Sequence, residues 1–213
     1  MSTDREKLLE DALVQFIKPI KGIPFEVIIK SLCGVEVERF DLSIAENVAV
    51  LEIIVTAMKA AGNAVRTTPI IRPRPNEVGN DMEPFVIGAL KANGLSAAAP
   101  RTKGGFGKAT GYPDVRIATS TKPIFIEVKT YAIETHLTTM RSFYLSPAED
   151  PKVFEDGYHL LVGFEMVRNG NSYSPSGFKM VDLYGLVCDM KSEFNSDNRR
   201  LYEKGRLLAQ ERL

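Results

Sequence analysis

The first seventy residues carry apolar side chains with the spacing of helices. Within residues 3–18, leucine, alanine, phenylalanine and isoleucine recur at positions i, i+3 and i+4, and a proline ends the pattern. Similar spacing predicts two further helices, over about 24–33 and about 44–61. We therefore predict an N-terminal helical subdomain over residues 1–70.

The remainder of the chain, residues 71–213, mixes helix and strand patterns. Residues 168–177 are polar and rich in glycine and serine, which predicts a loop. The other expected elements, in chain order, are a helix over 80–94, a strand pair over 114–131, a polar strand over 132–147, strands over 159–166 and 178–190, and a closing helix over 193–210. This order predicts an α/β domain with a mixed central sheet flanked by helices.

The strand pair is the most distinctive part of the chain. In its second half, apolar residues alternate with Phe125, Glu127 and Lys129, so Glu127 and Lys129 project to the same side of a strand. The residues Ser-Thr-Lys-Pro before this strand favour a turn, and the segment that follows Asp114 also has a strand pattern. A β-hairpin of this form brings Asp114 close to Glu127.

Two carboxylates at that distance repel each other, and without a partner one of them takes up a proton. A hard divalent cation removes this conflict, because Mg²⁺ binds a few carboxylate oxygens together with water and phosphate oxygens. Lys129, next to the two acids, could orient or deprotonate a water molecule at the metal, or stabilise the charge that builds on a phosphate under attack.

The residues Pro113-Asp114 and Glu127-Val128-Lys129 resemble the signature of the PD-(D/E)XK nuclease superfamily. The resemblance implies Mg²⁺-dependent hydrolysis of DNA phosphodiesters on a mixed sheet flanked by helices. It also implies that Asp114 and Glu127 bind the metal, that the Val128 carbonyl can add a ligand, and that Lys129 assists the attacking water. The alternative is an ordinary hairpin with an exposed, weak Glu127–Lys129 pair.

Many nucleases that this chain resembles carry a further acid on the helix that precedes the aspartate strand. Glu83 is our candidate for this catalytic acid, and Glu77 is the second choice. Asn80 and Glu83 also have the spacing of a capping box, and an acid in the first turn suits the helix dipole. Capping of the helix is therefore an equally good explanation of Glu83.

Two polar segments on either side of the hairpin are candidates for DNA contact. Before it, residues 97–114 are rich in glycine and include Lys103 and Lys108, which could grip phosphates or lie on an ordinary mobile loop. After it, the polar strand offers donors and acceptors suited to base edges, namely Thr138, Thr139, Arg141 and Ser142. This order resembles the PvuII- and EcoRV-like branch of restriction enzymes, although of the histidines of that branch only His136 lies nearby. An exposed edge strand is the alternative.

The composition is that of a globular protein without a strong global charge. Hydrophobic residues make up 44% and charged residues 25%, and the net charge is zero. The neutral balance counts against a nucleic-acid binder, although a local cationic cleft needs no overall excess. The two cysteines lack metal-ligand spacing, and the apolar run over 47–58 is interrupted by Glu52 and short for a bilayer. These features indicate a soluble, cytoplasmic protein.

From the resemblance we expect a restriction-endonuclease-like fold and a type II restriction endonuclease that cuts double-stranded DNA at specific sites with Mg²⁺. Residues 71–213 would form the nuclease core, and residues 1–70 a dimerisation or DNA-wrapping region, or a plain helical cover. Cutting both strands of a palindrome requires a homodimer. Two alternatives stay open: a structure-directed repair or junction nuclease, and a DNA-binding module that keeps the scaffold without activity.

Overall fold

The computed structural model describes residues 4–73, 77–108, 110–132, 143–192, 196–201, 203, 205 and 209. It divides into a larger compact unit, Pro24–Leu186, and a smaller one formed by the two ends of the chain. The smaller unit contains the helices α1 (Asp4–Ile17) and α5 (Asn198–Leu201) and the strand β9 (Val187–Cys188). The short strand β1 (Ile23–Pro24) pairs with β9 as a two-stranded sheet.

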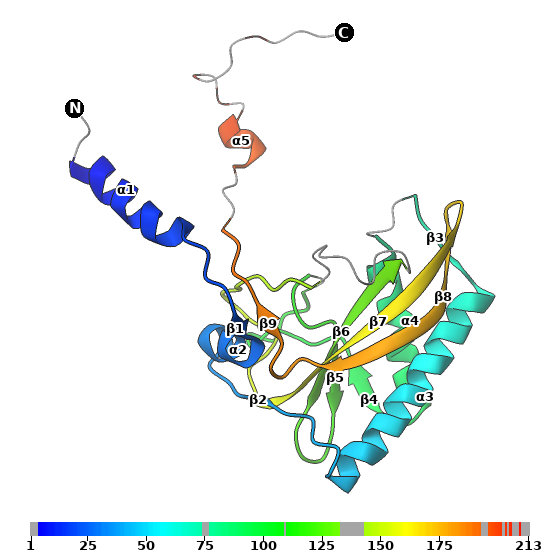
Figure 1. Cartoon of the computed structure of the whole chain (residues 1–213). Helices are drawn as coiled ribbons and strands as arrows, with labels where there is room; N and C mark the ends of the chain where they lie inside the picture. The colour runs from blue at the N-terminus through cyan, green and yellow to red at the C-terminus, as the bar shows by residue number, and fades with distance from the viewer. Residues whose placement is uncertain are drawn as a thin grey trace. The chain divides into compact units, whose positions relative to one another are not determined.

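The larger unit is built on a seven-stranded mixed sheet (Figure 1). Its strands are β2 (Val37–Glu38), β3 (Ile70–Ile71), β4 (Ser96–Ala98), β5 (Val115–Ala118), β6 (Ile124–Ala132), β7 (Gly157–Asn169) and β8 (Ser172–Asp182). They follow the order β3-β8-β7-β6-β5-β4, with β2 beside β7. The pairs β6–β7 and β2–β7 are parallel, and the other pairs are antiparallel.

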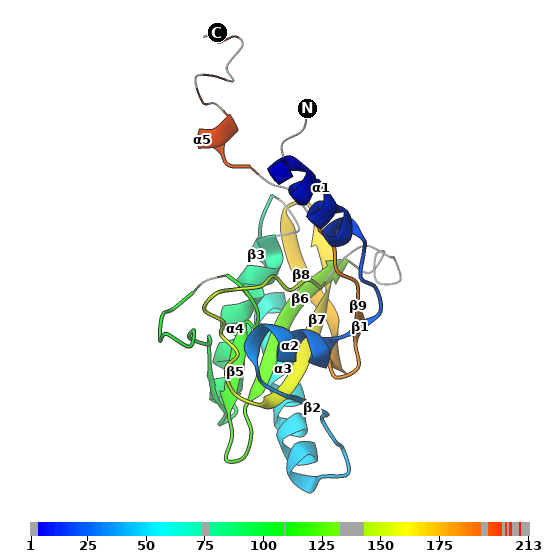
Figure 2. The same ribbon diagram turned by 90° about the vertical axis from the view of Figure 1, so that its left-hand side faces the viewer.

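Helices cover this sheet on both sides (Figures 1 and 2). The helices α3 (Ala45–Thr67) and α4 (Val78–Ala92) pack their buried residues into the main hydrophobic core with β5, β6 and β7. The helix α2 (Phe25–Cys33) belongs to a second core, which includes Phe125 of β6. The mixed sheet flanked by helices confirms the predicted fold class and is compatible with a restriction-endonuclease-like fold.

The strand β6 shows why the sequence pattern was informative. Its residues Ile124, Ile126 and Val128 lie in the main core, whereas Phe125 lies in the second core on the opposite face. The predicted alternation is therefore correct, but both faces at the start of the strand are buried. Glu127 shares its face with Phe125, so it projects toward the side of the sheet on which α2 lies.

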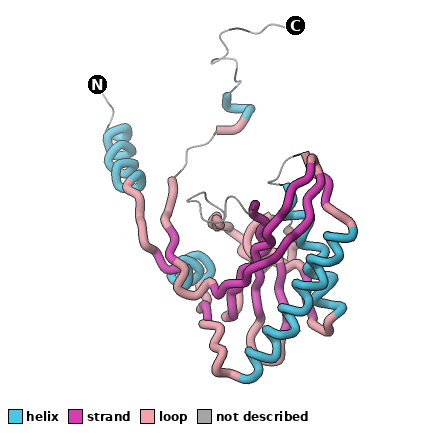
Figure 3. The backbone as a smooth tube through the Cα atoms, turned by 45° about the vertical axis from the view of Figure 1, so that its right-hand side comes forward, coloured by secondary structure: helices cyan, strands magenta, loops and turns pink. Residues whose placement is uncertain are grey.

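Some predicted elements were wrong. Residues 168–177 form no long loop, because β7 continues to Asn169 and β8 begins at Ser172 (Figure 3). Tyr173 and Pro175 alternate as buried residues along β8, a pattern that the surrounding serines and glycine concealed. Phe143–Pro147, the end of the predicted polar strand, has no regular structure, and residues 133–142 lie outside the described residues.

The helix α3 is the one helix in the described ranges that is long and apolar enough to cross a membrane by length and composition. Its buried residues, among them Ile54, Met58 and Val65, pack in the main core of the larger unit. Such a core helix passes the same test, so this is weak evidence for a membrane span. The helices α2 and α3 belong to the same compact unit as the sheet, and the role predicted for residues 1–70 stays a prediction.

Candidate active site

The hairpin β5–β6 brings the two predicted acids together. Its register pairs Val115 with Ile126, so the next position places Asp114 opposite Glu127. The Val128 backbone N–H donates a hydrogen bond of 2.8 Å to Oδ2 of Asp114. This bond holds the Asp114 carboxylate over β6, beside the strand residue that follows Glu127.

Glu127 and Lys129 form a close ion pair on the same face of β6. Nζ of Lys129 lies 2.5 Å from Oε1 of Glu127, and the Glu127 residue is only 4% exposed. The other carboxylate oxygen, Oε2, is buried without a hydrogen-bond partner within the described part of the chain. Nζ of Lys129 also lies 5.7 Å from the ring centre of Tyr144. The alternative of an exposed pair is therefore wrong, because the Glu127 side chain is 5% and the Lys129 side chain 26% exposed.

Burial shapes the protonation of these groups. Burial raises the pKa of Glu127 to about 7, and the nearby Asp114 carboxylate adds to the rise, while Lys129 opposes it. Burial also raises the pKa of Asp114, against the Val128 N–H and the cations Lys129 and Lys152. For Lys129, burial lowers the pKa, but Glu127 and Asp114 outweigh it and the net shift is upward. Lys129 is therefore held as a cation in this structure.

Glu83 approaches the same acids from α4. Burial raises its pKa to about 7, and the charge of Asp114 contributes to that shift. The helix begins at Val78 after Glu77, so Asn80 is inside the helix and the capping-box explanation of Glu83 is wrong. Glu77 instead stands at the start of the helix, near Arg72, whose pKa is raised mainly by its hydrogen bonds to Asp81 and only in small part by the charge of Glu77. The structure thus places Glu83 near the paired acids.

A lysine that the sequence did not single out lies at the same place. Lys152, between β6 and β7, is 6% exposed, and its Nζ donates hydrogen bonds to the carbonyls of Gly111, at 2.7 Å, and Pro113, at 3.2 Å. The charges of Asp114 and Glu83 act on it. No motif marks Lys152, because its relation to Asp114 depends on the tertiary fold.

An aromatic cluster packs around the segment that leads into Asp114. Tyr112 and His159 are joined by a hydrogen bond of 2.6 Å and their rings are stacked, with Phe25 packed edge-on against both. Burial lowers the pKa of His159 to about 3, so its imidazole is neutral at physiological pH. His159 is therefore a structural residue of this cluster.

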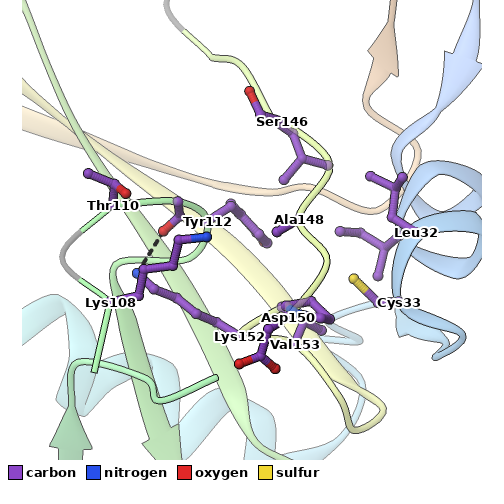
Figure 4. Close-up of a pocket in the computed structure, with 14 residues that line it drawn as sticks. Leu32, Cys33, Lys108, Thr110, Tyr112, Ser146, Ala148, Asp150, Lys152 and Val153 are labelled. Atoms are coloured by element: carbon purple, nitrogen blue, oxygen red, sulfur yellow. Dashed lines mark hydrogen bonds between the residues drawn. The ribbon is translucent and has the colours of Figure 1, made fainter. Parts of the chain in front are cut away.

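Two hydrogen bonds attach the glycine-rich segment to residues 150 and 151. The Gly104 N–H donates to Oδ1 of Asp150 at 3.0 Å, and the Lys103 N–H donates to the Pro151 carbonyl at 3.0 Å. Lys108 lines a cavity together with Thr110, Tyr112 and Lys152 (Figure 4). Lys103 and Lys108 thus lie on a loop tied to the segment that carries Lys152. The predicted DNA-reading residues Thr138, Thr139, Arg141 and Ser142 lie outside the described residues.

A magnesium ion is consistent with this donor set. Among the residues that the structure describes, no three acidic, histidine or cysteine side chains form a group able to hold a metal by themselves. Mg²⁺ does not require such a group, because it is usually bound by one or two carboxylates, waters and substrate phosphates. The buried Oε2 of Glu127, which has no partner among the described atoms, is an oxygen available to a cation.

Comparisons with known proteins identify the family to which the chain belongs. A protein-family model described as the type II restriction enzyme MjaV family matches residues 19–205. The curated type II restriction enzyme MjaV of Methanocaldococcus jannaschii is 32% identical over 221 residues, which cover 96% of each chain. No solved structure matches the chain.

Both matches are to type II restriction enzymes. The chain belongs to the type II restriction enzyme MjaV family.

Proposed function

We propose that this protein is a Mg²⁺-dependent endonuclease that hydrolyses double-stranded DNA at a specific site, with a PD-(D/E)XK active site. The observation that carries the proposal is the group formed by Asp114, Glu127 and Lys129 on one hairpin, in which Asp114 stands opposite Glu127 and Lys129 contacts Glu127. The family match supports the same activity, because its members are described as type II restriction enzymes.

In this proposal Asp114 and Glu127 hold the metal, with the Val128 carbonyl as a further ligand and Glu83 completing its surroundings. The bound Mg²⁺ would supply a polarised water and neutralise charge on the phosphate. The Val128 N–H fixes one oxygen of Asp114, and the Asp114 side chain also interacts with that of Glu127. Lys129, held as an ammonium by Glu127 and Asp114, can orient the water and donate a hydrogen bond to the phosphate.

DNA would reach this site past the glycine-rich loop. The backbone of that loop is fixed by Asp150 and Pro151, next to Lys152 in the chain, and Lys103 and Lys108 on the loop could contact phosphates without reading sequence. Base recognition by Thr138, Thr139, Arg141 and Ser142, as in the PvuII- and EcoRV-like arrangement, remains part of this proposal.

We also propose a homodimer, which cleavage of both strands of a palindrome requires. Every residue of α1 is exposed, including its six large apolar side chains: Leu8, Leu9, Leu13, Val14, Phe16 and Ile17. An exposed apolar helix face of this kind favours association with another copy of the chain. This supports a dimerisation role within residues 1–70.

Incubation of the protein with plasmid DNA and Mg²⁺ tests the proposal. Discrete fragments are expected, and they should disappear with Asp114→Ala and Lys129→Ala. Glu165→Ala, at a half-buried position of β7 where the carboxylate accepts a hydrogen bond from Ser176, removes an acid outside the proposed site and is the control that should cut normally. Cutting of forked or nicked DNA without sequence preference would point to a junction nuclease. A folded wild-type protein that binds DNA but never cuts it would point to an inactive binding module.

A further inference from the structure

Lys152 is a buried cation whose contacts converge on the segment that leads into Asp114. Its Nζ donates to the carbonyls of Gly111, at 2.7 Å, and Pro113, at 3.2 Å. The two carbonyls belong to the residues on either side of Tyr112 in the sequence, and the second of these residues directly precedes Asp114. One ammonium group therefore fixes the backbone at two points just ahead of the first acid.

A buried ammonium is costly unless it is both hydrogen-bonded and balanced by charge. The two carbonyls satisfy two of the three N–H donors of Lys152 but carry no charge. The balancing charge comes from the acids of the site: burial lowers the pKa of Lys152, and Asp114, Glu83 and Glu127 oppose that fall. Lys152 is thus tied by hydrogen bonds to the backbone and by charge to the three carboxyl groups.

The segment that carries Lys152 is itself anchored. Val153, its neighbour, is 1% exposed and belongs to the second core with Phe25 and Phe125. Phe125 lies on β6, the strand that carries Glu127. Lys152 therefore connects residues 111–113, which precede Asp114, with the second core, which packs against the strand of Glu127. The relative position of the two acids depends on this connection.

We propose that Lys152 is a positioning residue of the active site, which holds residues 111–113 so that the Asp114 carboxylate faces Glu127 and both can bind one divalent cation. This inference rests on the proposed function. It assigns to Lys152 no contact with DNA, because two of its donors are already used by the backbone.

Removal of the ammonium has two opposing effects on metal binding. Loss of a positive charge near the acids would tighten the binding of a cation, whereas release of residues 111–113 would move Asp114 and weaken it. The inference requires that the second effect dominates. Residues that support metal ligands from behind typically contribute about 10- to 100-fold to metal affinity or activity, which sets the expected size.

The test compares wild-type protein with Lys152→Met, which keeps the alkyl chain and removes the donors and the charge. The matched control is Lys122→Met, which removes an ammonium paired with Glu38 at the turn between β5 and β6. Two quantities are measured: Mg²⁺ binding by calorimetry without DNA, and kcat and KM for cleavage of a DNA with one site.

We expect Lys152→Met to weaken Mg²⁺ binding about 10-fold or more and to lower kcat by about 10- to 100-fold, with KM for DNA changed less than about 2-fold. Lys122→Met should match the wild type in all three. If Lys152→Met fails to fold, Lys152→Gln, which is too short to reach both carbonyls, carries the same expectation.

A folded Lys152 variant with unchanged or tighter Mg²⁺ binding and unchanged kcat would overturn the inference and leave the proposed function intact. The proposed function fails by a different result, namely wild-type protein that neither binds Mg²⁺ nor cuts DNA.

Discussion

Glu127 carries a carboxylate into a site where it is only 4% exposed and leaves one of its oxygens without a hydrogen-bond partner among the described atoms. Such burial is unfavourable for stability, because a buried acid has lost its hydration. The ion pair of 2.5 Å with Lys129 offsets this loss of hydration at one of the two oxygens. The remaining oxygen supports the proposal that Glu127 binds a cation, since folding alone would favour an apolar side chain at this position.

The pH dependence of stability should reveal these acids. Both Glu83 and Glu127 have a pKa raised to about 7, above the ordinary value of 4.5, so the folded state keeps protons that the unfolded state loses. Their contribution to stability is present at low pH and is lost as pH rises from about 4.5 through about 7. Thermal melts of metal-free protein should show this loss, reduced in Glu127→Gln relative to the wild type.

Addition of Mg²⁺ should reverse that trend, because the metal binds the deprotonated carboxylates. The increase in melting temperature on adding Mg²⁺ should therefore be larger at pH 8 than at pH 6. An increase that is equal at both pH values would contradict the assignment of these acids to a cation site.

At the scale of elements, the hairpin β5–β6 determines the site, and its position depends on how closely β7 approaches it. The Tyr158 N–H at the start of β7 donates to the Pro123 carbonyl at 3.0 Å. A Cβ atom at Gly157 would lie 2.7 Å from the same carbonyl oxygen, so only glycine fits there. The parallel pairing of β6 with β7, which aligns Glu127 with Leu161, thus depends on a close backbone contact.

Gly157→Ala should destabilise the fold by about 1–3 kcal/mol, because the added methyl group meets backbone that cannot rotate away. Gly177→Ala in β8 is the matched control, since a Cβ atom there has nothing within 4 Å. The control should change stability by less than about 0.5 kcal/mol. Urea unfolding of both variants measures the difference, and equal stabilities would show that the contact at Gly157 is not limiting.

The hairpin could be predicted from sequence because its signals are local: alternation along β6 and a turn before it. Glu83 could be proposed only from the resemblance, and its place beside Asp114 depends on how α4 packs. Lys152 was missed, since nothing in its neighbours along the chain marks it. The strand β8 was partly mistaken for a loop, because Ser172 and Pro175 are weak strand formers and their pairing with β7 is a tertiary fact.

At the scale of the whole molecule, the larger unit contains the fold and the site, and the smaller unit adds an apolar helix with no buried residue. Phe16 is 70% exposed and Leu8 is 71% exposed. Scattered exposed apolar residues are ordinary, but several on one helix mark a surface for association.

Replacing Phe16 with glutamate should therefore shift the protein toward the monomer. Light scattering should give about twice the chain mass of 23.6 kDa for the wild type and about the chain mass itself for Phe16→Glu. Leu42→Glu, at an exposed position in the larger unit that is 60% accessible, is the control and should stay dimeric. Dimers in all three proteins would exclude α1 as the dimerisation surface.

The central claim is that Asp114 and Glu127 share one divalent cation. A crystal structure with Mn²⁺ in place of Mg²⁺, with the metal located by its anomalous scattering, tests this directly. We predict a single strong peak within coordination distance of both carboxylates, about 2.0–2.3 Å from their oxygens, which is lost in Asp114→Asn. A peak bound elsewhere, or no peak in a protein that cuts DNA with Mn²⁺, would contradict the account.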